Sequence, residues 1–325
     1  MLPVIFSVLN FNKMKFLEYL LVRMLHAFFR IVPLQFNHKL AQFLAVVIRR
    51  IIRYRTGIVR DNLTSSFPNY SEAQINQVIK EVYFNFSCLW TELIQNERFT
   101  TRYIDKYIRV HNYEVVEEAQ KEGKGLIFLS GHIGNFEWLG YYITVRLNNL
   151  NAVMKPVRNK RINDFIIKRR LNQGVQLIFI KGALKRCLVV LFEGQNVALA
   201  ADQDAGHKGV FVQFFNRPAS TAMGAAQLHI KTGAPLIFSV GIRRKWGEFD
   251  LYFERIPDFM DSRDHVQNIF NITQEHTRRL ENWVNRYPGQ YFWTHKRWKT
   301  IPNTMEMNDY ISKLKTFKKL STKVQ

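Results

Sequence analysis

The hydrophobic and polar positions of the first hundred residues repeat with the period of a helix. Between Lys15 and Leu34, the basic side chains fall within about 140° of one face at 100° per residue, and leucines and phenylalanines occupy the other face. Ser71 begins a capping box, and an apolar stripe at helical spacing follows it as far as Leu93. These patterns predict an all-helical region whose second stripe packs in the core.

Beyond residue 110 the pattern changes to helices that alternate with short apolar strands. The expected strands are 125–130, 152–155, 175–180, 197–201, 235–242 and 251–256. The expected helices are 112–123, one from Asn135, 159–173, one that Ser220 or Thr221 caps and that runs to Gly233, and 264–286. Such alternation is typical of a layered α/β domain, here expected to have a central mixed sheet flanked by helices.

The chain is expected to contain three regions. Residues 1–55 are predicted to be membrane-associating helices, 56–300 an α/β domain with a helical subregion to about residue 110, and 301–325 a basic tail. A clean span needs about 20 apolar residues, so the interrupting charges favour a helix that lies in the lipid interface. A helix packed on the domain and a short or tilted span are the alternatives. The apolar start, 1–11, lacks the features of a cleaved signal peptide.

Composition adds an electrostatic constraint. The chain has 47 Lys and Arg against 26 Asp and Glu, a formal charge of +21. Such a field favours anionic partners, namely nucleic acid, anionic lipid headgroups or acidic carrier proteins. Cys88 and Cys187 each lie in an apolar run, which argues against a disulfide framework. Neither a glycine-rich nucleotide motif nor a spaced Cys/His cluster occurs, so no nucleotide or metal site is predicted.

Candidate chemistry lies just after the first predicted strand. This strand ends at Ser130, and His132 follows on the turn into a helix, where α/β sheets commonly place reactive groups. Glu137 is expected to fold back toward the imidazole, so that one ring nitrogen is held and the other takes a proton from a hydroxyl. The alternative is a histidine that caps the helix beside an exposed glutamate. Close backbone approach and free helix N–H groups complete the predicted site, at Gly131, Gly134 and Asn135.

Four stretches in order along the chain carry a family resemblance. They are His132-Ile-Gly-Asn-Phe-Glu137, Arg170-Leu-Asn-Gln-Gly174, Asp202-Gln-Asp-Ala-Gly206 with the Phe-Phe segment after it, and the closing stretch 287–299. They are similar to the His-x4-Asp/Glu, Arg-x3-Gly, Asp-Gln and C-terminal Trp-x-His-x-Arg-Trp-Lys motifs of the late acyltransferases of lipid A biosynthesis, in the lysophospholipid acyltransferase superfamily. The resemblance covers most of residues 50–300. Because Arg169 adjoins Arg170, the second match has an alternative register one residue earlier.

The resemblance implies transfer of a fatty acyl chain onto a hydroxyl of a lipid A precursor. The donor would be acyl carrier protein, with acyl-CoA as the alternative, and no other cofactor is implied. His132 would be the general base and Glu137 would orient and support the imidazolium. Arg170 would bind a lipid phosphate or polarise the thioester, and Asp202 would orient Arg170 or its own loop. The enzyme would lie at the bacterial inner membrane, with its active site facing the cytoplasm.

Two other functions stay open at this stage. The same fold and residue pair would also serve a lysophospholipid, an aminolipid or another glycolipid as acceptor. A nucleic-acid-binding protein without catalysis would explain the positive charge and the aromatic and cationic residues of 293–299. It would not explain the four ordered motifs, and a packed structural signature near the active-site wall fits 293–299 better.

Overall fold

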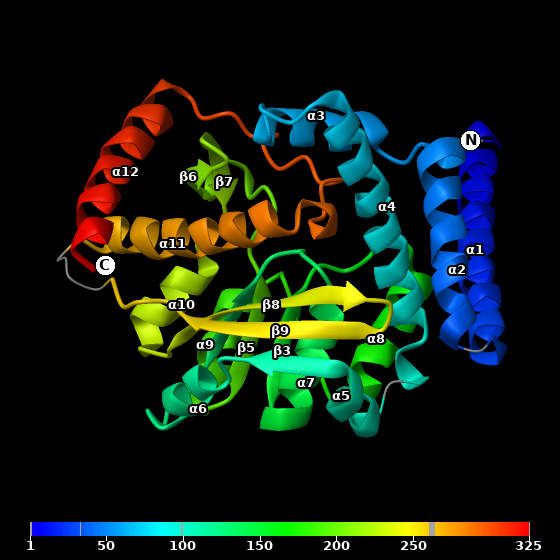
Figure 1. Ribbon diagram of the computed structural model, residues 1–325, viewed down its shortest axis with the longest axis horizontal. Coiled ribbons are helices and arrows are strands. Elements are labelled where there is room, and N and C mark those ends of the chain that lie inside the picture. The colour runs from blue at the N-terminus through cyan, green and yellow to red at the C-terminus, as the bar shows by residue number, and fades with distance from the viewer. Residues whose placement is uncertain (1, 33, 99, 260–263, 325) are drawn as a thin grey trace.

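A seven-stranded mixed sheet forms the centre of the computed structural model, which describes residues 2–32, 34–98, 100–259 and 264–324 (Figure 1). The strand order is β1-β9-β8-β2-β5-β3-β4, and only β8 and β9 pair in antiparallel fashion within it. A separate two-stranded hairpin joins β6 to β7. The strands are β1 Ile108–His111, β2 Ile127–Ser130, β3 Leu150–Met154, β4 Gln176–Phe179, β5 Asn196–Ala200, β6 Val210–Phe214, β7 Arg217–Thr221, β8 Leu236–Lys245 and β9 Glu248–Arg255.

Helices surround this sheet on both faces. They are α1 Leu2–Ile31, α2 Leu34–Val46, α3 Thr56–Ser66, α4 Glu72–Ile94, α5 Thr101–Tyr107, α6 Glu114–Gln120, α7 Phe136–Leu147, α8 Lys160–Asn172, α9 Ala183–Phe192, α10 Gly224–Thr232, α11 His265–Arg286 and α12 Thr304–Val324. A π-helix (Val47–Ile52) extends α2, and short 3-10 turns lie at Asn96–Arg98, Gly206–Lys208 and Pro288–Gln290. The expected layered α/β fold, with a central mixed sheet flanked by helices, is therefore confirmed.

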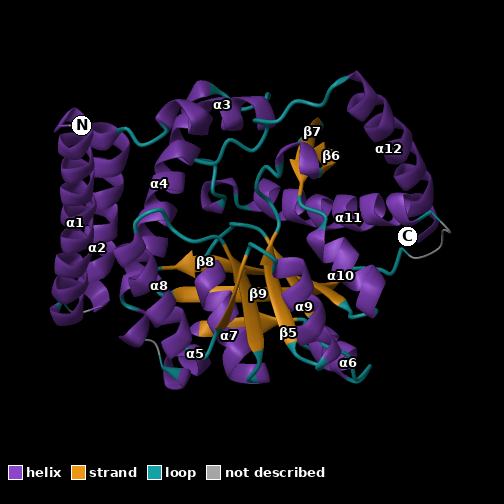
Figure 2. Ribbon diagram, turned by 180° about the vertical axis from the view of Figure 1, so that it is seen from behind, coloured by secondary structure: helices purple, strands orange, loops and turns teal. Residues whose placement is uncertain are grey.

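Two hydrophobic cores lie on the two faces of the sheet. In β2, Phe128 packs with α5, α6 and α7, whereas Ile127 and Leu129 join the core under α4, α10 and α11. This alternation follows from the two-residue period of a strand. Figure 2 shows α5, α6 and α7 together on one side of the sheet and α11 on the other. The central strand is thus buried on both faces, and its carboxyl end is held from both sides.

The first two helices stand side by side at one end of the molecule and contact α4 (Figure 1). The Nδ1 atom of His26 in α1 lies 3.2 Å from the Ile94 carbonyl oxygen at the end of α4. Asn37 of α2 donates to the side chain of Gln95 just beyond α4. Across the described ranges, no helix is both long enough and apolar enough to cross a bilayer. The side chains of the apolar start at 1–11 lie outside the described residues.

The expected helices and strands are largely present, but strands β1, β6 and β7 were not predicted. Ser71 and Gln74 form the expected capping box of α4. The helix expected from Ser220 or Thr221 instead begins at Gly224, because 217–221 is strand β7. A two-residue turn with positive φ at Phe215 and Asn216 connects it to β6, and this backbone geometry favours a tight hairpin. Strand β1, at the edge of the seven-stranded sheet next to β9, was not predicted, because its four residues are too short to show a pattern.

Candidate active site

Two neighbouring parallel strands bring the central histidine and an aspartate together. Ser130 of β2 is in register with Ala200 of β5, and His132 and Asp202 each follow two residues later. Both side chains therefore leave the sheet at the same carboxyl edge. Gly131 permits α11 to pack closely against this edge, because a Cβ there would lie 2.6 Å from Leu280 Cδ1. The sheet thus builds the site from residues that are distant in sequence.

Asp202 holds His132 by two contacts. The backbone N–H of His132 donates to Asp202 Oδ2 at 2.9 Å, and His132 Nδ1 lies 2.6 Å from Asp202 Oδ1. Burial alone would lower the pKa of His132, but the charge and hydrogen bond of Asp202, with a smaller effect from Glu137, raise it overall. Burial would raise the pKa of Asp202, yet the same pairing lowers it to about 2. Asp202 is therefore a carboxylate at neutral pH and fixes which imidazole nitrogen faces it.

Glu137 contacts an arginine and makes no hydrogen bond to the imidazole. Its carboxylate accepts from Arg170 Nε at 3.0 Å and also from Arg170 Nη2, so that the two side chains form a two-point ion pair. Burial tends to lower the pKa of Arg170, but Glu137 raises it overall. The expected Glu137–His132 contact is therefore replaced by Asp202–His132, and the expected Asp202–Arg170 contact by Glu137–Arg170. All four are predicted site residues, and they form two pairs other than those expected.

The two adjacent arginines of α8 have separate surroundings. Arg170 reaches Glu137 and the Met154 sulfur, whereas Arg169 turns to the other side. There it is buried and donates to Asn96 at 2.9 Å, to Glu97 at 3.2 Å and toward the ring of His26 in α1. The arginine that contacts Glu137 is thus Arg170, and Arg169 points away from it.

The turn after His132 requires glycine at one position. Gly134 has φ +59°, and a Cβ there would lie 1.9 Å from the Gly241 carbonyl oxygen of β8. The next residue, Asn135, donates its N–H to that same oxygen at 2.7 Å, and its side chain caps α7 by accepting from Trp138. The backbone N–H groups of residues 132–135 all have partners within the protein. These four N–H groups are therefore not free to stabilise an oxyanion, and the expected free N–H groups at the start of α7 stay a prediction for Phe136 and Glu137.

The closing motif runs directly behind the histidine. Phe292 donates its N–H to the His132 carbonyl at 2.9 Å, and Ile133 forms an antiparallel bridge with Tyr291. Trp293 and Arg297 are almost wholly buried, which confirms the expectation of a packed structural signature at the site wall. Arg297 donates to the Ser220 carbonyl and to Thr221, both at 2.5 Å.

A small pocket opens beside the imidazole. The rings of Phe136 and Phe292 flank His132, with centroid distances of 5.0 and 5.9 Å. No hydrogen bond among the described residues occupies His132 Nε2, and nearly a quarter of the side chain is exposed. The lining also includes Tyr291 and, from α4, Val82, Phe86 and Leu89. An imidazole with a carboxylate on Nδ1, an open Nε2 and an apolar pocket can accept a proton from a hydroxyl bound there.

Other reactive groups fit less well. Both cysteines are free and buried, and burial raises the pKa of Cys88 to about 12 and that of Cys187 to about 11. Neither is therefore a thiolate nucleophile at neutral pH. Within the described ranges, no three His, Cys, Asp or Glu side chains gather in a way that would hold a metal ion.

Comparison with known proteins gives one consistent group. The sequence model of the family described as "Bacterial lipid A biosynthesis acyltransferase" matches residues 10–300. The lipid A biosynthesis palmitoleoyltransferase of Escherichia coli (strain K12) is 24% identical over 264 residues, which cover 80% of this chain and 83% of the relative. The lipid A biosynthesis lauroyltransferase of the same strain is 24% identical over 276 residues, 83% of this chain and 88% of the relative. A phosphatidylinositol mannoside acyltransferase of Mycobacterium tuberculosis (strain ATCC 25618 / H37Rv) is 26% identical over 156 residues, 46% of this chain and 49% of the relative.

Proposed function

We propose that this chain, which belongs to the bacterial lipid A biosynthesis acyltransferase family, moves a fatty acyl chain from a thioester donor to a hydroxyl of a lipid A precursor. As a member of that family it is an acyltransferase. The donor proposed is acyl carrier protein, since the +21 charge suits an acidic carrier as well as a phosphorylated glycolipid. The observation that carries the mechanism is the His132–Asp202 pair at the mouth of an apolar pocket.

The proposed reaction starts with proton transfer. His132 Nε2 takes the proton of the acceptor hydroxyl while its oxygen attacks the thioester carbonyl carbon. Asp202 stabilises the imidazolium that forms and keeps Nδ1 directed toward itself. The tetrahedral intermediate then breaks its C–S bond, and the imidazolium returns the proton to the departing sulfur. One ester forms, one thioester breaks, and His132 ends neutral.

Arg170 is proposed to bind negative charge near the reacting centre. Its positive charge acts on His132, where it opposes the rise in pKa that Asp202 causes. Glu137 holds the Arg170 guanidinium by two contacts. The remaining guanidinium nitrogen, Nη1, faces the Met154 sulfur. A guanidinium fixed in this way suits a thioester oxyanion or a lipid phosphate. Glu137 is then a positioning residue for Arg170.

The N-terminal helices are proposed to lie on the surface of the bacterial inner membrane, with the active site facing the cytoplasm. Leu17, Leu21 and Met24 of α1 are each more than half exposed. Ile51 and Ile52 of the π-helix are also exposed and lie next to Arg49 and Arg50. Exposed apolar side chains beside cations fit a lipid interface with anionic headgroups.

The test is an acyl-transfer assay with the purified full chain and long-chain acyl carrier protein. The acceptors are a phosphorylated glucosamine lipid bearing 3-hydroxyacyl chains, a mannosylated phosphoinositide and a lysophospholipid. We expect transfer to the glucosamine lipid, and a loss of about 10²–10⁴-fold in His132→Ala, the range for a general base. His207→Ala is the matched control, because His207 is exposed and pairs with Glu306 of α12.

The outcomes separate the alternatives. Transfer only to the mannosylated lipid or the lysolipid would retain the mechanism and change the acceptor. Wild-type turnover in folded His132→Ala would exclude the proposed general base. Replacing the carrier-linked donor by acyl-CoA in the same assay tests the choice of donor.

A further inference from the structure

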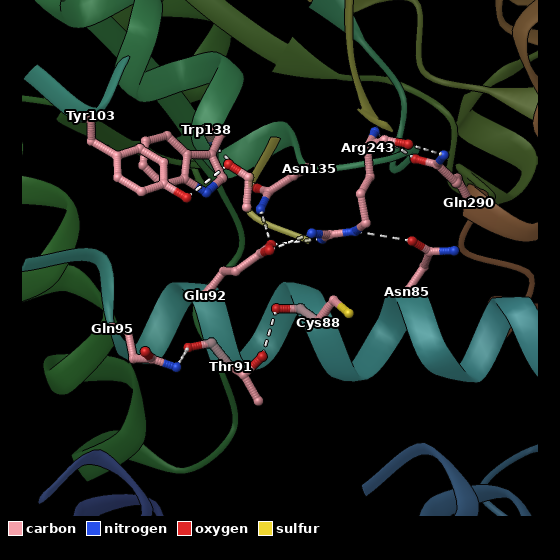
Figure 3. A network of polar contacts seen from close by, with 11 residues as sticks. Asn85, Cys88, Thr91, Glu92, Gln95, Tyr103, Asn135, Trp138, Arg243 and Gln290 are labelled. Carbon is pink, nitrogen blue, oxygen red and sulfur yellow. Dashed lines mark hydrogen bonds and ion pairs between the residues drawn. The ribbon is translucent and has the colours of Figure 1, made fainter. Parts of the chain in front are cut away.

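A fully buried ion pair lies behind the active site. Glu92 of α4 is 2% exposed and Arg243 of β8 is 6% exposed. Arg243 Nη2 donates to Glu92 Oε2 at 2.6 Å, and Nη1 donates to Oε1, so that the contact has two points (Figure 3). Burial tends to lower the pKa of Arg243, but Glu92 raises it well above its ordinary value. The Arg243 guanidinium therefore stays charged although the pair is buried.

On the Glu92 side, the pair reaches the turn that carries the catalytic histidine. Glu92 Oε2 also accepts from Asn135 Nδ2 at 2.6 Å. Asn135 in turn caps α7 and is bound to β8 through the Gly241 carbonyl oxygen. The carboxylate of an α4 residue thus fixes the residue three positions after His132.

On the Arg243 side, the pair reaches the segment that closes the site. The Gln290 side chain accepts from the backbone N–H of Arg243 and donates to its backbone carbonyl oxygen, both at 2.8 Å. The Gln290 carbonyl oxygen accepts the N–H of Gly134 at 2.9 Å. Arg243 Nε donates to Asn85, whose amide donates to the Gly289 carbonyl oxygen at 3.1 Å. Figure 3 shows Asn85, Arg243, Glu92 and Asn135 in one connected network.

Stability alone gives little reason for such a pair. Desolvation of two charges offsets much of their attraction, and well-packed apolar side chains of similar volume are often as stable. What the pair supplies here is a fixed geometry, because a two-point contact sets both distance and orientation. The pair's side-chain partners lie on both flanks of His132, at Asn135 and at Asn85, which binds the 288–292 segment at Gly289.

We propose that Glu92 and Arg243 are positioning residues for acyl transfer. Their ion pair locks the turn of His132 to the 288–292 segment, and so keeps Nδ1 against Asp202 and Nε2 toward the pocket. Neither side chain touches the reacting atoms. This inference rests on the proposed function, since it assigns a role in the same reaction.

The test compares two substitutions of the same kind. Arg243→Lys keeps the positive charge but loses the planar two-point contact. We expect kcat to fall about 100-fold with an unchanged KM for the acceptor, as for a misplacement of about 1 Å at a reacting group. Arg279→Lys is the matched control, because Arg279 of α11 makes ion pairs with Glu254 and Glu275 away from the His132 turn. It should retain wild-type kcat.

A readout independent of turnover is the titration of the His132 imidazole by NMR, assigned by its absence in His132→Ala. We expect the pKa of His132 to fall in Arg243→Lys, because a looser turn weakens the contact with Asp202 while net charge is unchanged. If Arg243→Lys does not fold, Asn85→Ala removes two links of the network without unpairing a buried charge. It should lower kcat about tenfold and shift the same titration, on the same positional argument.

A folded Arg243→Lys with wild-type kcat and an unshifted His132 titration would overturn the positioning role. If wild-type protein transfers no acyl group, the proposed function fails, and the titration still decides whether the pair holds the histidine. A fall in melting temperature alone, equal in Arg243→Lys and Arg279→Lys, would reduce the pair to a structural contact.

Discussion

The backbone N–H and the Nδ1 atom of His132 both contact the carboxylate of Asp202, a residue 70 positions later in the chain. One oxygen thus fixes the backbone of the turn and the other fixes the ring. Because Asp202 is itself buried, its negative charge acts on the imidazole with little screening by water. This single carboxylate sets both the orientation of the proposed base and its affinity for a proton.

Replacing this carboxylate should change both the rate and its pH dependence. In Asp202→Asn, burial dominates and the pKa of His132 falls, since Asp202 is the main cause of its rise. The base must be neutral to accept a proton, so the acidic limb of the profile of kcat/KM against pH should move to lower pH. We expect kcat to fall about 10²–10⁴-fold as the imidazole loses its orienting partner. Asp204→Asn, which loses contacts with Thr300 in the same loop, is the control. A normal profile in Asp202→Asn would contradict the pairing.

Substitutions in the Glu137–Arg170 pair should affect stability and turnover differently. Arg170→Gln leaves Glu137 as a mostly buried, unpaired charge and should lower the unfolding free energy by about 3 kcal/mol. The double variant Glu137→Gln/Arg170→Gln should recover most of that loss, because both charges are gone. Its turnover should stay low if Arg170 binds the oxyanion or a phosphate. Denaturant unfolding and the acyl-transfer assay measure the two quantities; recovery of both would leave Arg170 a purely structural role.

The glycine of the His132 turn should be irreplaceable, whereas a neighbouring glycine should not be. Gly134→Ala combines a positive φ with a contact of 1.9 Å to a backbone oxygen, and should cost about 3 kcal/mol or more. Gly140→Ala in α7 meets nothing within 4 Å and should stabilise the helix by about 0.5–1 kcal/mol. Melting temperatures of the two variants provide the comparison. Equal effects would mean that the turn relaxes around the added methyl group.

Binding to lipid should depend on the exposed face of α1. The triple variant Leu17→Ser/Leu21→Ser/Met24→Ser should bind anionic vesicles at least about tenfold more weakly, because full burial of one such side chain is worth about 1.5–3 kcal/mol. Ile301→Ser is the control, since this side chain is even more exposed but lies after the closing motif. Vesicle sedimentation measures the effect. Unchanged binding by the triple variant would place the lipid contact elsewhere.

Local sequence patterns predicted the helices and strands better than they predicted which side chains contact one another. The strand ending at Ser130 and the helix beginning after Asn135 were predicted because apolar runs and caps are local signals. The partner of His132 was not, because β5 follows β2 in the sheet only after two intervening strands in sequence. Glu137 was the nearer carboxylate along the chain, but helix α7 directs it toward Arg170. The available signal was that His132 and Asp202 each follow a predicted strand. To use it, one must know that these two strands are neighbours in the sheet.

Glu92 was missed for a related reason. The α4 stripe was recognised by its apolar members, and a glutamate at its border looks like an ordinary solvent-facing residue. Its burial depends on Arg243, which is 151 residues away. Long-range ion pairs of this kind have no local pattern, so a charged residue beside an apolar stripe is the only available hint.

The adjacent arginines of α8 also bear on how the protein can be shortened for experiments. Arg169 is buried partly by His26 of the N-terminal helix pair, while Arg170, one residue on, holds Glu137. A version trimmed before residue 55 to improve handling would expose Arg169 to water, next to Arg170, the residue proposed to bind negative charge. Loss of activity in such a fragment would then report damage to α8, and not a need for the membrane.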